Sequence, residues 1–355
     1  MLKEERMNPH RNSAIEFLRI LSMLTIVGVH YWGACHTTEI IERNDNSYMV
    51  LKMLQVLCSY GVDIFVIITG YYMIGRTFVN IRKVFDLIWE IAFYGAILYC
   101  LSIQIGINTF TLPGLIKAVF PFLIGLRWFV KAYIILFLLI PFINKVLNAI
   151  DKKAHLSLAS ILLILFSLWP FILPYPPMDD YGFSFNNFIV IYVIAAYIRK
   201  YVYEYDVKWC VWAFFISTLL SYFLMVLPDG GGIFSIMKVM VLAHNSPLQI
   251  VACFSLFMLF LKMEWHNRYI NMLAASAFSV YVIHGEFNIM QWMFAILFRG
   301  NQFQYGWVWL LHWFGTILIV YIVCFIIDSI VKSTILRIFS ICFDECKYLN
   351  LTIKC

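Results

Sequence analysis

The sequence predicts an all-α integral membrane protein, a polytopic bundle of about ten transmembrane helices with both termini cytoplasmic. Three observations lead to this fold class. Of the 355 residues, 63% are apolar or aromatic and only 13% are charged, whereas a typical soluble domain carries about 25% charged residues. Apolar runs of about 17 to 25 residues recur along the chain, a length that crosses a hydrocarbon core roughly 30 Å thick. The third observation is an uneven distribution of Lys and Arg between alternate loops.

Ten apolar runs are long enough to form such helices. We predict helices near 15–34, 51–74, 84–106, 128–148, 156–173, 187–202, 209–227, 247–263, 271–298 and 306–333. The segment 113–126 is also apolar, but Pro113, Gly114 and Pro121 interrupt it. Because these residues disfavour an unbroken helix, we expect the segment to be re-entrant or interfacial.

The basic residues orient the predicted bundle, because Lys and Arg are retained in short cytoplasmic loops. With the N-terminus in the cytoplasm, the inner segments hold eighteen of the 26 basic residues and the outer segments hold five. This bias supports an even number of crossings. We therefore predict a cytoplasmic N-terminal segment 1–14, a membrane domain 15–335 and a cytoplasmic tail 336–355.

Charge and cysteine usage narrow the classes of partner and site. The net charge of +6 could indicate an anionic partner, but the basic residues gather in these short loops, where they set membrane orientation. No nucleic acid partner is therefore expected. The nine cysteines show neither CxxC nor Cys/His ligand spacing, so the sequence predicts neither a disulfide framework nor a metal site.

The first predicted helix carries three ionisable residues. Glu16 and Arg19 lie in its cytoplasmic turns, and His30 follows eleven residues after Arg19. Eleven residues is close to three turns of 3.6, so Arg19 and His30 share one face about 16 Å apart. There His30 can take a proton from a hydroxyl or carry an acyl group, and Arg19 can pair with phosphate. The alternatives are an interface anchor for Arg19 and a hydrogen-bonded interior histidine for His30.

The second predicted helix and the loop after it add further charged candidates. Asp63 lies within the apolar run, where it can orient a histidine or pair with a basic group; packing near an interface is the alternative. The following loop, RTFVNIRK, holds Arg76, Arg82 and Lys83. Such a cluster can grip the phosphates of a nucleotide-like donor, although the same residues also serve as the topology signal.

Two later helices carry the remaining candidates. Arg127 and Trp128 lie at a membrane mouth and are candidates for substrate binding. The ninth helix contains Ser279, Tyr281 and His284, of which the histidine can assist catalysis and the other two can position a substrate. The alternative is that these are satisfied polar residues of a helix bundle.

Two outer loops are rich in turn residues and aromatic residues. They cover 174–187 and 228–246. Both are candidates for lining a sugar site, although aromatic residues also gather at any membrane interface.

At these residues the chain resembles the acyltransferase-3 family of membrane O-acyltransferases. The family pattern of Arg, ten residues and His fits Arg19 and His30. VDIFVIITGYYM looks like the family's apolar segment that ends in a Ser-Gly-Phe-type turn, with Thr69-Gly70-Tyr71 in that place. RWFVKAYIILFLLIPFI is similar to its Trp-aromatic helix, and SAFSVYVIHGE is similar to its Ser-Phe-Ser-x-Tyr-x-x-His segment. These segments appear in the family's order from residue 14 to about 335.

The resemblance implies an O-acyltransferase, in particular an O-acetyltransferase, at a bacterial cytoplasmic membrane. It implies that cytoplasmic acyl-CoA, such as acetyl-CoA, is the donor substrate, with no bound cofactor. The acceptor would be a hydroxyl of a lipid-linked or nascent surface polysaccharide. Arg19 and Arg82 would hold the CoA phosphates, and His30 would meet the thioester as general base or acyl carrier, with Asp63 or His284 as a helper.

A polytopic transporter or flippase for a glycan or glycolipid is the competing function. Membrane-embedded charges and outer aromatic residues are expected there as well. The chain shows no broken, paired helices in equivalent halves, and the order of its motifs favours the enzyme. Consumption of an acyl-CoA thioester discriminates the two functions.

Overall fold

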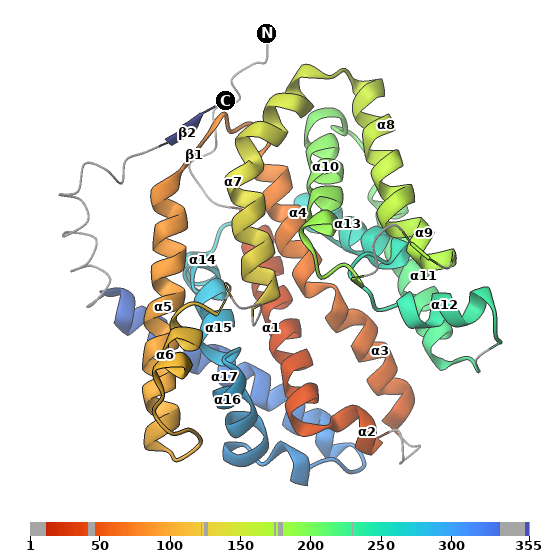
Figure 1. The fold of residues 1–355 in the computed structure, drawn as a ribbon. Coiled ribbons are helices and arrows are strands. Elements are labelled where there is room, and N and C mark those ends of the chain that lie inside the picture. The colour runs from red at the N-terminus through yellow and green to blue at the C-terminus, as the bar shows by residue number, and fades with distance from the viewer. Residues whose placement is uncertain are drawn as a thin grey trace.

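The protein is an all-α bundle in the part of the chain that its computed structural model describes, namely residues 12–41, 47–121, 123, 127–173, 175–176, 180–228, 230–333 and 352–354 (Figure 1). The first half contains α1 Ser13–Cys35, α2 Thr37–Ile41, α3 Tyr48–Ser59, α4 Gly61–Met73, α5 Ile81–Gln104, α6 Leu112–Val119, α7 Trp128–Ala149, α8 Lys152–Leu163 and α9 Trp169–Ile172. A π-helical turn, Ile164–Leu168, joins α8 to α9.

The second half continues in the same way. It contains α10 Phe185–Tyr201, α11 Val207–Val226, α12 Ile233–Met240, α13 Pro247–Leu261, α14 Arg268–Ala275, α15 Ala277–His284, α16 Phe287–Gln291 and α17 Val308–Val331. A π-helical turn, Trp292–Leu297, and a 3₁₀ turn, Gly300–Gln302, lie between α16 and α17. Two short strands, β1 Phe78–Asn80 and β2 Thr352–Lys354, pair antiparallel beside the start of α5.

Among the described residues, seven helical spans are long and apolar enough to cross a membrane. They are Ser13–Cys35, Tyr48–Met73, Ile81–Gln104, Trp128–Ala149, Lys152–Ile172, Val207–Val226 and Val308–Val331. Each coincides with a range that the sequence predicts. The chain is therefore a multi-pass helical membrane protein.

The other three predicted ranges hold helices that are short or divided. Helix α10 has 17 residues and α13 has 15, which at 1.5 Å per residue is about 25 Å or less, just under the usual crossing length. The range 271–298 holds the end of α14 and then α15, α16 and the π turn. The breaks follow Ser276 and Gly285. These interruptions cannot be predicted from composition, because the range 271–298 is apolar on both sides of each break.

The apolar segment after α5 does not form a crossing helix in its described part. Helix α6 has eight residues, about 12 Å, against a core of roughly 30 Å. It packs against α5 so closely that a Cβ added at Gly95 would lie 2.0 Å from the carbonyl oxygen of Ala118. An interfacial or re-entrant position agrees with this length; residues 122 and 124–126 lie outside the described part.

Helix α1 is the most buried of the seven spans and packs against α3, α4, α13, α14, α15 and α17. Helix α4 in turn lies against α10, where Gly70 meets Tyr192 and Ala195. Asn144 of α7 donates to the carbonyl oxygens of Met73 (2.7 Å) and Arg76 (2.8 Å), which satisfies the end of α4. Helices α1, α4 and α7 therefore have a fixed arrangement around the centre of the bundle.

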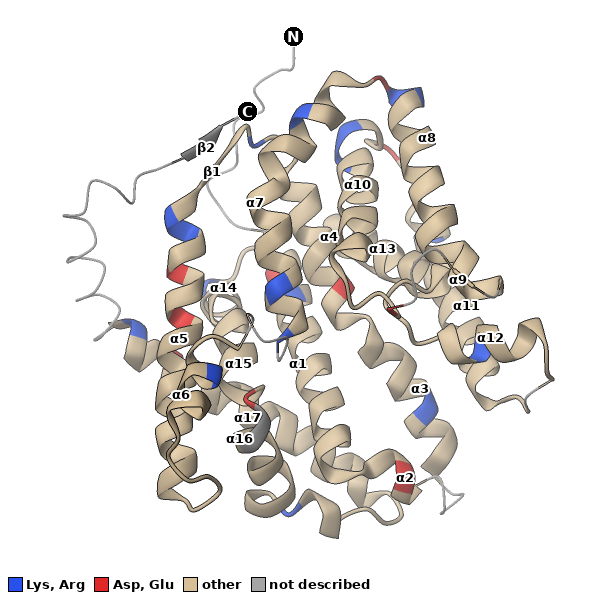
Figure 2. Ribbon diagram, viewed as in Figure 1, with Lys and Arg blue, Asp and Glu red and all other residues tan. Residues whose placement is uncertain are grey.

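The basic residues at the helix ends gather on one side of the bundle. Figure 2 shows Lys and Arg at the starts of α5 and α8 and at the ends of α7 and α10, which lie at the same end of the molecule. This is the end that the sequence assigns to the cytoplasm. Most of the predicted segments 1–14 and 336–355 lies outside the described residues.

Candidate active site

Two histidines from distant parts of the chain meet inside the bundle. Atom Nδ1 of His30 on α1 lies 2.9 Å from Nε2 of His284 on α15. Atom Nδ1 of His284 lies 2.5 Å from the carbonyl oxygen of Val280, one turn earlier on the same helix. His284 is 1% exposed, whereas His30 is only half-buried. In this pair the imidazole of His30 is accessible, and the buried imidazole of His284 holds it in place through a hydrogen bond.

These contacts fix the tautomers of a neutral pair. A carbonyl oxygen can only accept, so Nδ1 of His284 carries the hydrogen and its Nε2 has a lone pair. Atom Nδ1 of His30 must then donate to that lone pair. The remaining nitrogen of His30, Nε2, is left unprotonated and has no hydrogen-bond partner among the described residues. The geometry thus produces a free base at His30.

Arg127 and Tyr281 lie beside the histidine pair. The Tyr281 ring centroid is 6.4 Å from each imidazole centroid, and the Arg127 guanidinium is 5.9 Å from the Tyr281 ring. Arg127 is 6% exposed and donates through Nη2 to the carbonyl oxygen of Val282 (3.0 Å). Its charge acts on both histidines, and its buried Nη1 has no hydrogen-bond partner in the described chain. A cationic donor is therefore held next to the free base.

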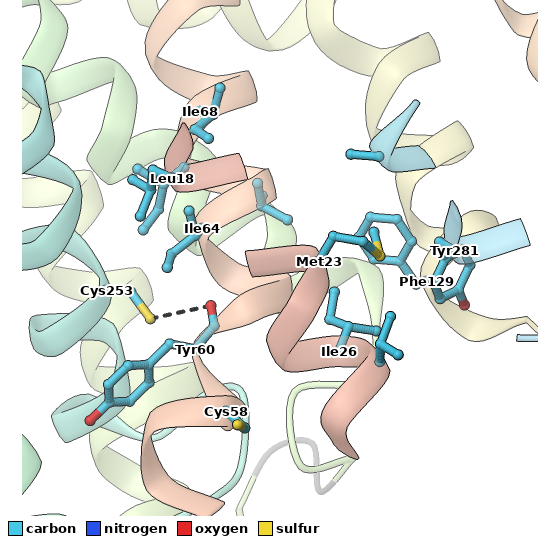
Figure 3. Packing of buried hydrophobic residues seen from close by; sticks show 14 of the residues in the cluster. Leu18, Met23, Ile26, Cys58, Tyr60, Ile64, Ile68, Phe129, Cys253 and Tyr281 are labelled. Carbon is cyan, nitrogen blue, oxygen red and sulfur yellow. Dashed lines mark hydrogen bonds between the residues drawn. The ribbon is translucent and has the colours of Figure 1, made fainter. Parts of the chain in front are cut away.

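The face of α1 between Arg19 and His30 lies against aromatic residues of α7 and α15. Figure 3 shows Met23 of α1 close to Phe129 and Tyr281. The rings of Phe129 and Tyr281 have centroids 5.5 Å apart. Two more aromatic residues of α7 continue this contact as a row. The ring of Tyr133 stacks on that of Phe129 with centroids 5.7 Å apart, and the ring of Phe137 lies 6.4 Å from that of Tyr133. Aromatic rings therefore lead along α7 toward its C-terminal end.

A groove between α5 and α7 opens beside that aromatic row. It has a volume of about 170 Å³ and is lined by Lys83, Val84, Leu87, Tyr133, Ile134 and Phe137. Lys83 is exposed at the start of α5, with Arg82 next to it. Arg76 is also exposed, just after α4. Of these three predicted basic residues, Lys83 is the one that lines the groove.

Arg19 has an acidic partner on its own helix. Its Nη1 lies 2.9 and 3.2 Å from the two carboxylate oxygens of Glu16. Nearby, Arg199 of α10 donates to the hydroxyl of Tyr71 at 3.2 Å and lies over that ring at 5.0 Å. Arg19 and Arg199 both act electrostatically on Tyr72. Two arginines from different helices, Arg19 and Arg199, therefore both lie close to Tyr72 near the end of α4.

Asp63 is fully buried but does not join the His30 pair. One carboxylate oxygen accepts from Nε2 of Gln249 at 2.6 Å, and the other lies 3.6 Å from Nδ1 of His244. His244 belongs to the connection between α12 and α13, outside the membrane-spanning helices, and burial lowers its pKa to about 4. Trp128 lies beside this group, with its ring centroid 5.3 Å from that of His244. The expectation that Asp63 faces a histidine agrees with this geometry, but the histidine is a different one.

Ser279 also has protein partners. Its hydroxyl contacts the carboxylate of Glu90 on α5 and accepts from Nζ of Lys332 at 3.0 Å. Lys332 pairs with Asp328 at 2.8 Å, and Tyr94 donates to the same carboxylate at 2.8 Å. This polar cluster joins α5, α15 and α17. The serine therefore supports the helix that carries His284 and is not placed against the imidazole pair.

Several residues of these clusters are not singled out by the sequence, and four of them illustrate why. They are Glu90, Arg199, His244 and Gln249. Glu90 was detectable as a carboxylate within an apolar run. Arg199 was counted only as a topology residue, and His244 and Gln249 were hidden because they lie in and just after a loop. One signal in the sequence could have identified His244 and Gln249: both are polar residues at the point where an outer loop passes into an apolar run.

The described residues contain neither a candidate metal site nor a disulfide. No group of three or more His, Cys, Asp or Glu side chains there could hold a metal ion. Cys35, Cys58, Cys100, Cys210, Cys253 and Cys324 are free.

The comparisons with known proteins assign the family. A family model described as an acyltransferase domain, that of the acyltransferase-3 family, matches residues 12–329. No curated protein and no solved structure matched the chain. The matched range extends from the start of α1 almost to the end of α17, and it includes both histidines of the pair. The chain therefore belongs to the acyltransferase-3 family of membrane acyltransferases, which are enzymes that move an acyl group from a donor to an acceptor.

Proposed function

We propose that this protein transfers an acyl group from cytoplasmic acyl-CoA to a hydroxyl of a surface glycan, with acetyl as the first candidate group. The contact between His30 and His284 is the observation that carries the proposal. A half-buried imidazole with an unprotonated Nε2, held by a second imidazole, is what hydroxyl activation in a protected cavity requires. A passive carrier has no need of a fixed imidazole tautomer.

His30 can perform the transfer by either of two routes. As a general base, its Nε2 takes the proton of the acceptor hydroxyl while the oxygen attacks the thioester carbonyl. The C–S bond breaks, and the thiolate receives that proton to give free thiol. As a carrier, Nε2 attacks the thioester carbonyl itself, and the C–S bond breaks to release the thiolate. The acceptor oxygen then attacks the acyl carbon and displaces the imidazole, and the hydroxyl proton passes to the thiolate to give free thiol. In both routes His284 orients the ring and stabilises the charge that His30 acquires.

Arg127 supports the same step. The thioester carbonyl oxygen becomes negative when the tetrahedral intermediate forms, and a buried cationic donor stabilises that oxygen. Nη2 of Arg127 is used by Val282, which anchors the guanidinium, while Nη1 lacks a partner among the described residues. We assign Nη1 to the developing oxyanion. This refines the predicted substrate-binding role of Arg127.

The donor enters from the cytoplasmic end in this proposal. Arg19 and Arg199 are placed to hold phosphates, and Lys83 marks the mouth of the groove between α5 and α7. The pantetheine arm then follows the aromatic row of α7 toward His30, about 16 Å further along α1 than Arg19. Arg76 and Arg82, both outside that groove, add positive charge at its entrance.

The topology that fits this function has ten crossings. Helices α10 and α13 and the divided segment α14–α16 would complete the seven long spans, with both termini cytoplasmic. The donor then binds at the basic end and the acceptor reaches the opposite end of the bundle. A bacterial cytoplasmic membrane, with a lipid-linked or nascent polysaccharide as acceptor, provides that arrangement.

Thiol release from acetyl-CoA tests the function directly. Purified protein in lipid vesicles, supplied with membrane glycolipid, should release thiol, and His30→Ala should abolish the release while inserting normally. His36→Asn is the matched control, because His36 is exposed at the left-handed end of α1, a conformation that Asn tolerates. Equal release by wild type and His30→Ala would refute the role of His30. Absence of release from any common acyl-CoA would favour the transporter.

A further inference from the structure

Residues on or next to four helices form a second polar site, distinct from the His30 pair. It consists of Asp63, His244, Trp128 and Phe183. Asp63 comes from α4, Trp128 starts α7, Phe183 precedes α10, and His244 precedes α13. The backbone brings the two loops together, because the amide of His244 donates to the carbonyl oxygen of Tyr181 at 2.9 Å.

The Asp63 carboxylate is the unusual feature of this site. It is 0% exposed, and its Oδ1 has no hydrogen-bond partner among the described residues. A buried carboxylate is costly unless it serves another group. Nδ1 of His244 faces Oδ1 at 3.6 Å.

Gln249 decides which nitrogen of His244 carries the hydrogen. The side-chain amide nitrogen of Gln249 donates to Asp63 (2.6 Å) and to the carbonyl oxygen of Ser59 (3.2 Å). Both of its hydrogens are thereby used, so it has none for Nδ1 of His244, 3.2 Å away. We therefore assign the hydrogen of His244 to Nδ1, which faces Oδ1 of Asp63. Atom Nε2 of His244 is left as an acceptor without a partner among the described residues.

Aromatic rings surround this acceptor. The Trp128 and Phe183 centroids lie 5.3 and 5.1 Å from that of His244, and the two rings meet edge to face at 4.7 Å. Phe183 is 48% exposed, and the side chain of His244 keeps 13% of its surface exposed. The site thus combines accessible apolar faces with one hydrogen-bond acceptor and a buried carboxyl group.

A pyranose ring matches that combination. Its C–H faces pack against aromatic rings, and its hydroxyls donate to an imidazole nitrogen. None of these four residues offers a cation to a sugar carboxylate, so a neutral sugar fits the site better than an acidic one. We propose that Asp63, His244, Trp128 and Phe183 form the acceptor subsite and bind a neutral pyranose, with Nε2 of His244 accepting a hydrogen bond from a ring hydroxyl.

The position of Trp128 connects this subsite to the reaction centre. Arg127 and Trp128 are consecutive, so their Cα atoms are about 3.8 Å apart. Arg127 binds the carbonyl oxygen of Val282 beside the histidine pair, whereas Trp128 contacts His244. A sugar on Trp128 is thus held next to the start of α7, on whose other side the acyl group arrives. The assignment of this site as the acceptor subsite rests on the proposed function. The inference that it binds a sugar does not depend on that function.

Direct binding tests the subsite without requiring catalysis. Saturation-transfer NMR would be recorded on protein in nanodiscs with methyl glycosides of glucose, galactose, N-acetylglucosamine and glucuronic acid. The wild type should transfer saturation to at least one neutral pyranoside and more weakly to the glucuronide. His244→Ala and Phe183→Ala should lower that affinity roughly five- to tenfold, the effect of losing one hydrogen bond or one ring contact. Trp209→Ala removes a tryptophan that is 75% exposed on α11 and should leave binding unchanged.

The outcomes separate this inference from the acyltransferase chemistry. In acyl transfer, His244→Ala should raise KM for the pyranoside while KM for acyl-CoA stays the same. Binding lost through His244 in a protein that never cleaves a thioester would refute the acyl chemistry and retain the sugar site. Undiminished binding by properly inserted His244→Ala and Phe183→Ala would overturn the subsite, as would absence of binding to every neutral pyranoside.

Discussion

Nδ1 of His30 and Nε2 of His284 lie 2.9 Å apart although 254 residues separate them along the chain. The contact joins α1 to α15, the helix that is bounded by Ser276 and Gly285. His284 donates from Nδ1 to the Val280 carbonyl, so its Nε2 accepts from Nδ1 of His30. Nε2 of His30 is then the one nitrogen of the pair that has neither a hydrogen nor a partner among the described residues. Gly285 ends the helix just after His284, and a Cβ there would lie 2.7 Å from the carbonyl oxygen of Tyr281, so this position requires glycine.

His284 is predicted to act by positioning His30. In His284→Leu the acceptor for Nδ1–H of His30 is lost, and we expect kcat to fall about 10²- to 10³-fold with KM for acyl-CoA unchanged. His284→Gln should recover part of kcat, because its carbonyl oxygen can accept the same hydrogen bond. Steady-state kinetics of thiol release measure both. His312→Gln is the control, as His312 is a hydrogen-bonded histidine of α17 outside the pair; wild-type kcat in His284→Leu would contradict the prediction.

Arg127 is predicted to contribute through its planar fork. Arg127→Met should lower kcat about 10²- to 10³-fold, the usual cost of removing one oxyanion donor. Arg127→Lys should remain well below wild type, because one ammonium cannot both reach the Val282 carbonyl and face the reacting oxygen. Lys131→Met, one turn later on α7 and exposed, should retain full activity. Wild-type kcat in Arg127→Lys would show that charge alone suffices.

The sequence predicts the helices better than it predicts their breaks. Apolar length alone locates all seven long spans, because hydrocarbon thickness fixes the length of a crossing helix. It does not reveal that the range 271–298 is divided, since Ser276 and Gly285 are tolerated in membrane helices and interrupt no apolar run. The sequence likewise does not predict the π turn at Ile164–Leu168, because its residues are as apolar as those of the helices on either side.

The candidate site was predictable where a charged residue stood alone in an apolar run. His30, Asp63 and His284 were found in this way. Their partners were not, because a contact between α1 and α15, or between α4 and the loop before α13, depends on packing that no single segment encodes. The sequence therefore indicates that Asp63 can orient a histidine or pair with a basic group, but it does not identify His244 as the residue that Asp63 faces.

The donor phosphates are predicted to interact with Lys83 and Arg19. Lys83→Gln and Arg19→Gln should each raise KM for acetyl-CoA about tenfold, because a charge-assisted hydrogen bond contributes about 1.5 kcal/mol or more. The same variants should show unchanged KM for acetyl-pantetheine, which has no phosphate. Lys208→Gln is the control, because Lys208 is exposed at the start of α11. Equal increases of KM for both donors would place these residues outside the phosphate site.

Gly70 is predicted to be essential for the packing of α4 on α10. A Cβ at this position would lie 2.9 Å from Cβ of Ala195 and 3.0 Å from Cα of Tyr192, so α10 would have to move as a unit. Gly70→Ala should therefore destabilise the protein by about 1–3 kcal/mol, the usual cost of overpacking. It should also raise KM for acyl-CoA, because the contact between Tyr71 and Arg199 spans the same interface.

Gly33→Ala is the matched control for this overpacking. Gly33 also lies within a membrane helix, but a Cβ there would meet no atom within 4 Å. Because alanine favours the helix by up to about 1 kcal/mol over glycine, this variant should be neutral or slightly more stable. Thermal aggregation of the two variants in detergent, with and without acyl-CoA, measures the difference. If Gly70→Ala were as stable as Gly33→Ala and bound acyl-CoA normally, α10 would have freedom to shift, and the position of Arg199 beside Tyr71 could not depend on close packing at Gly70.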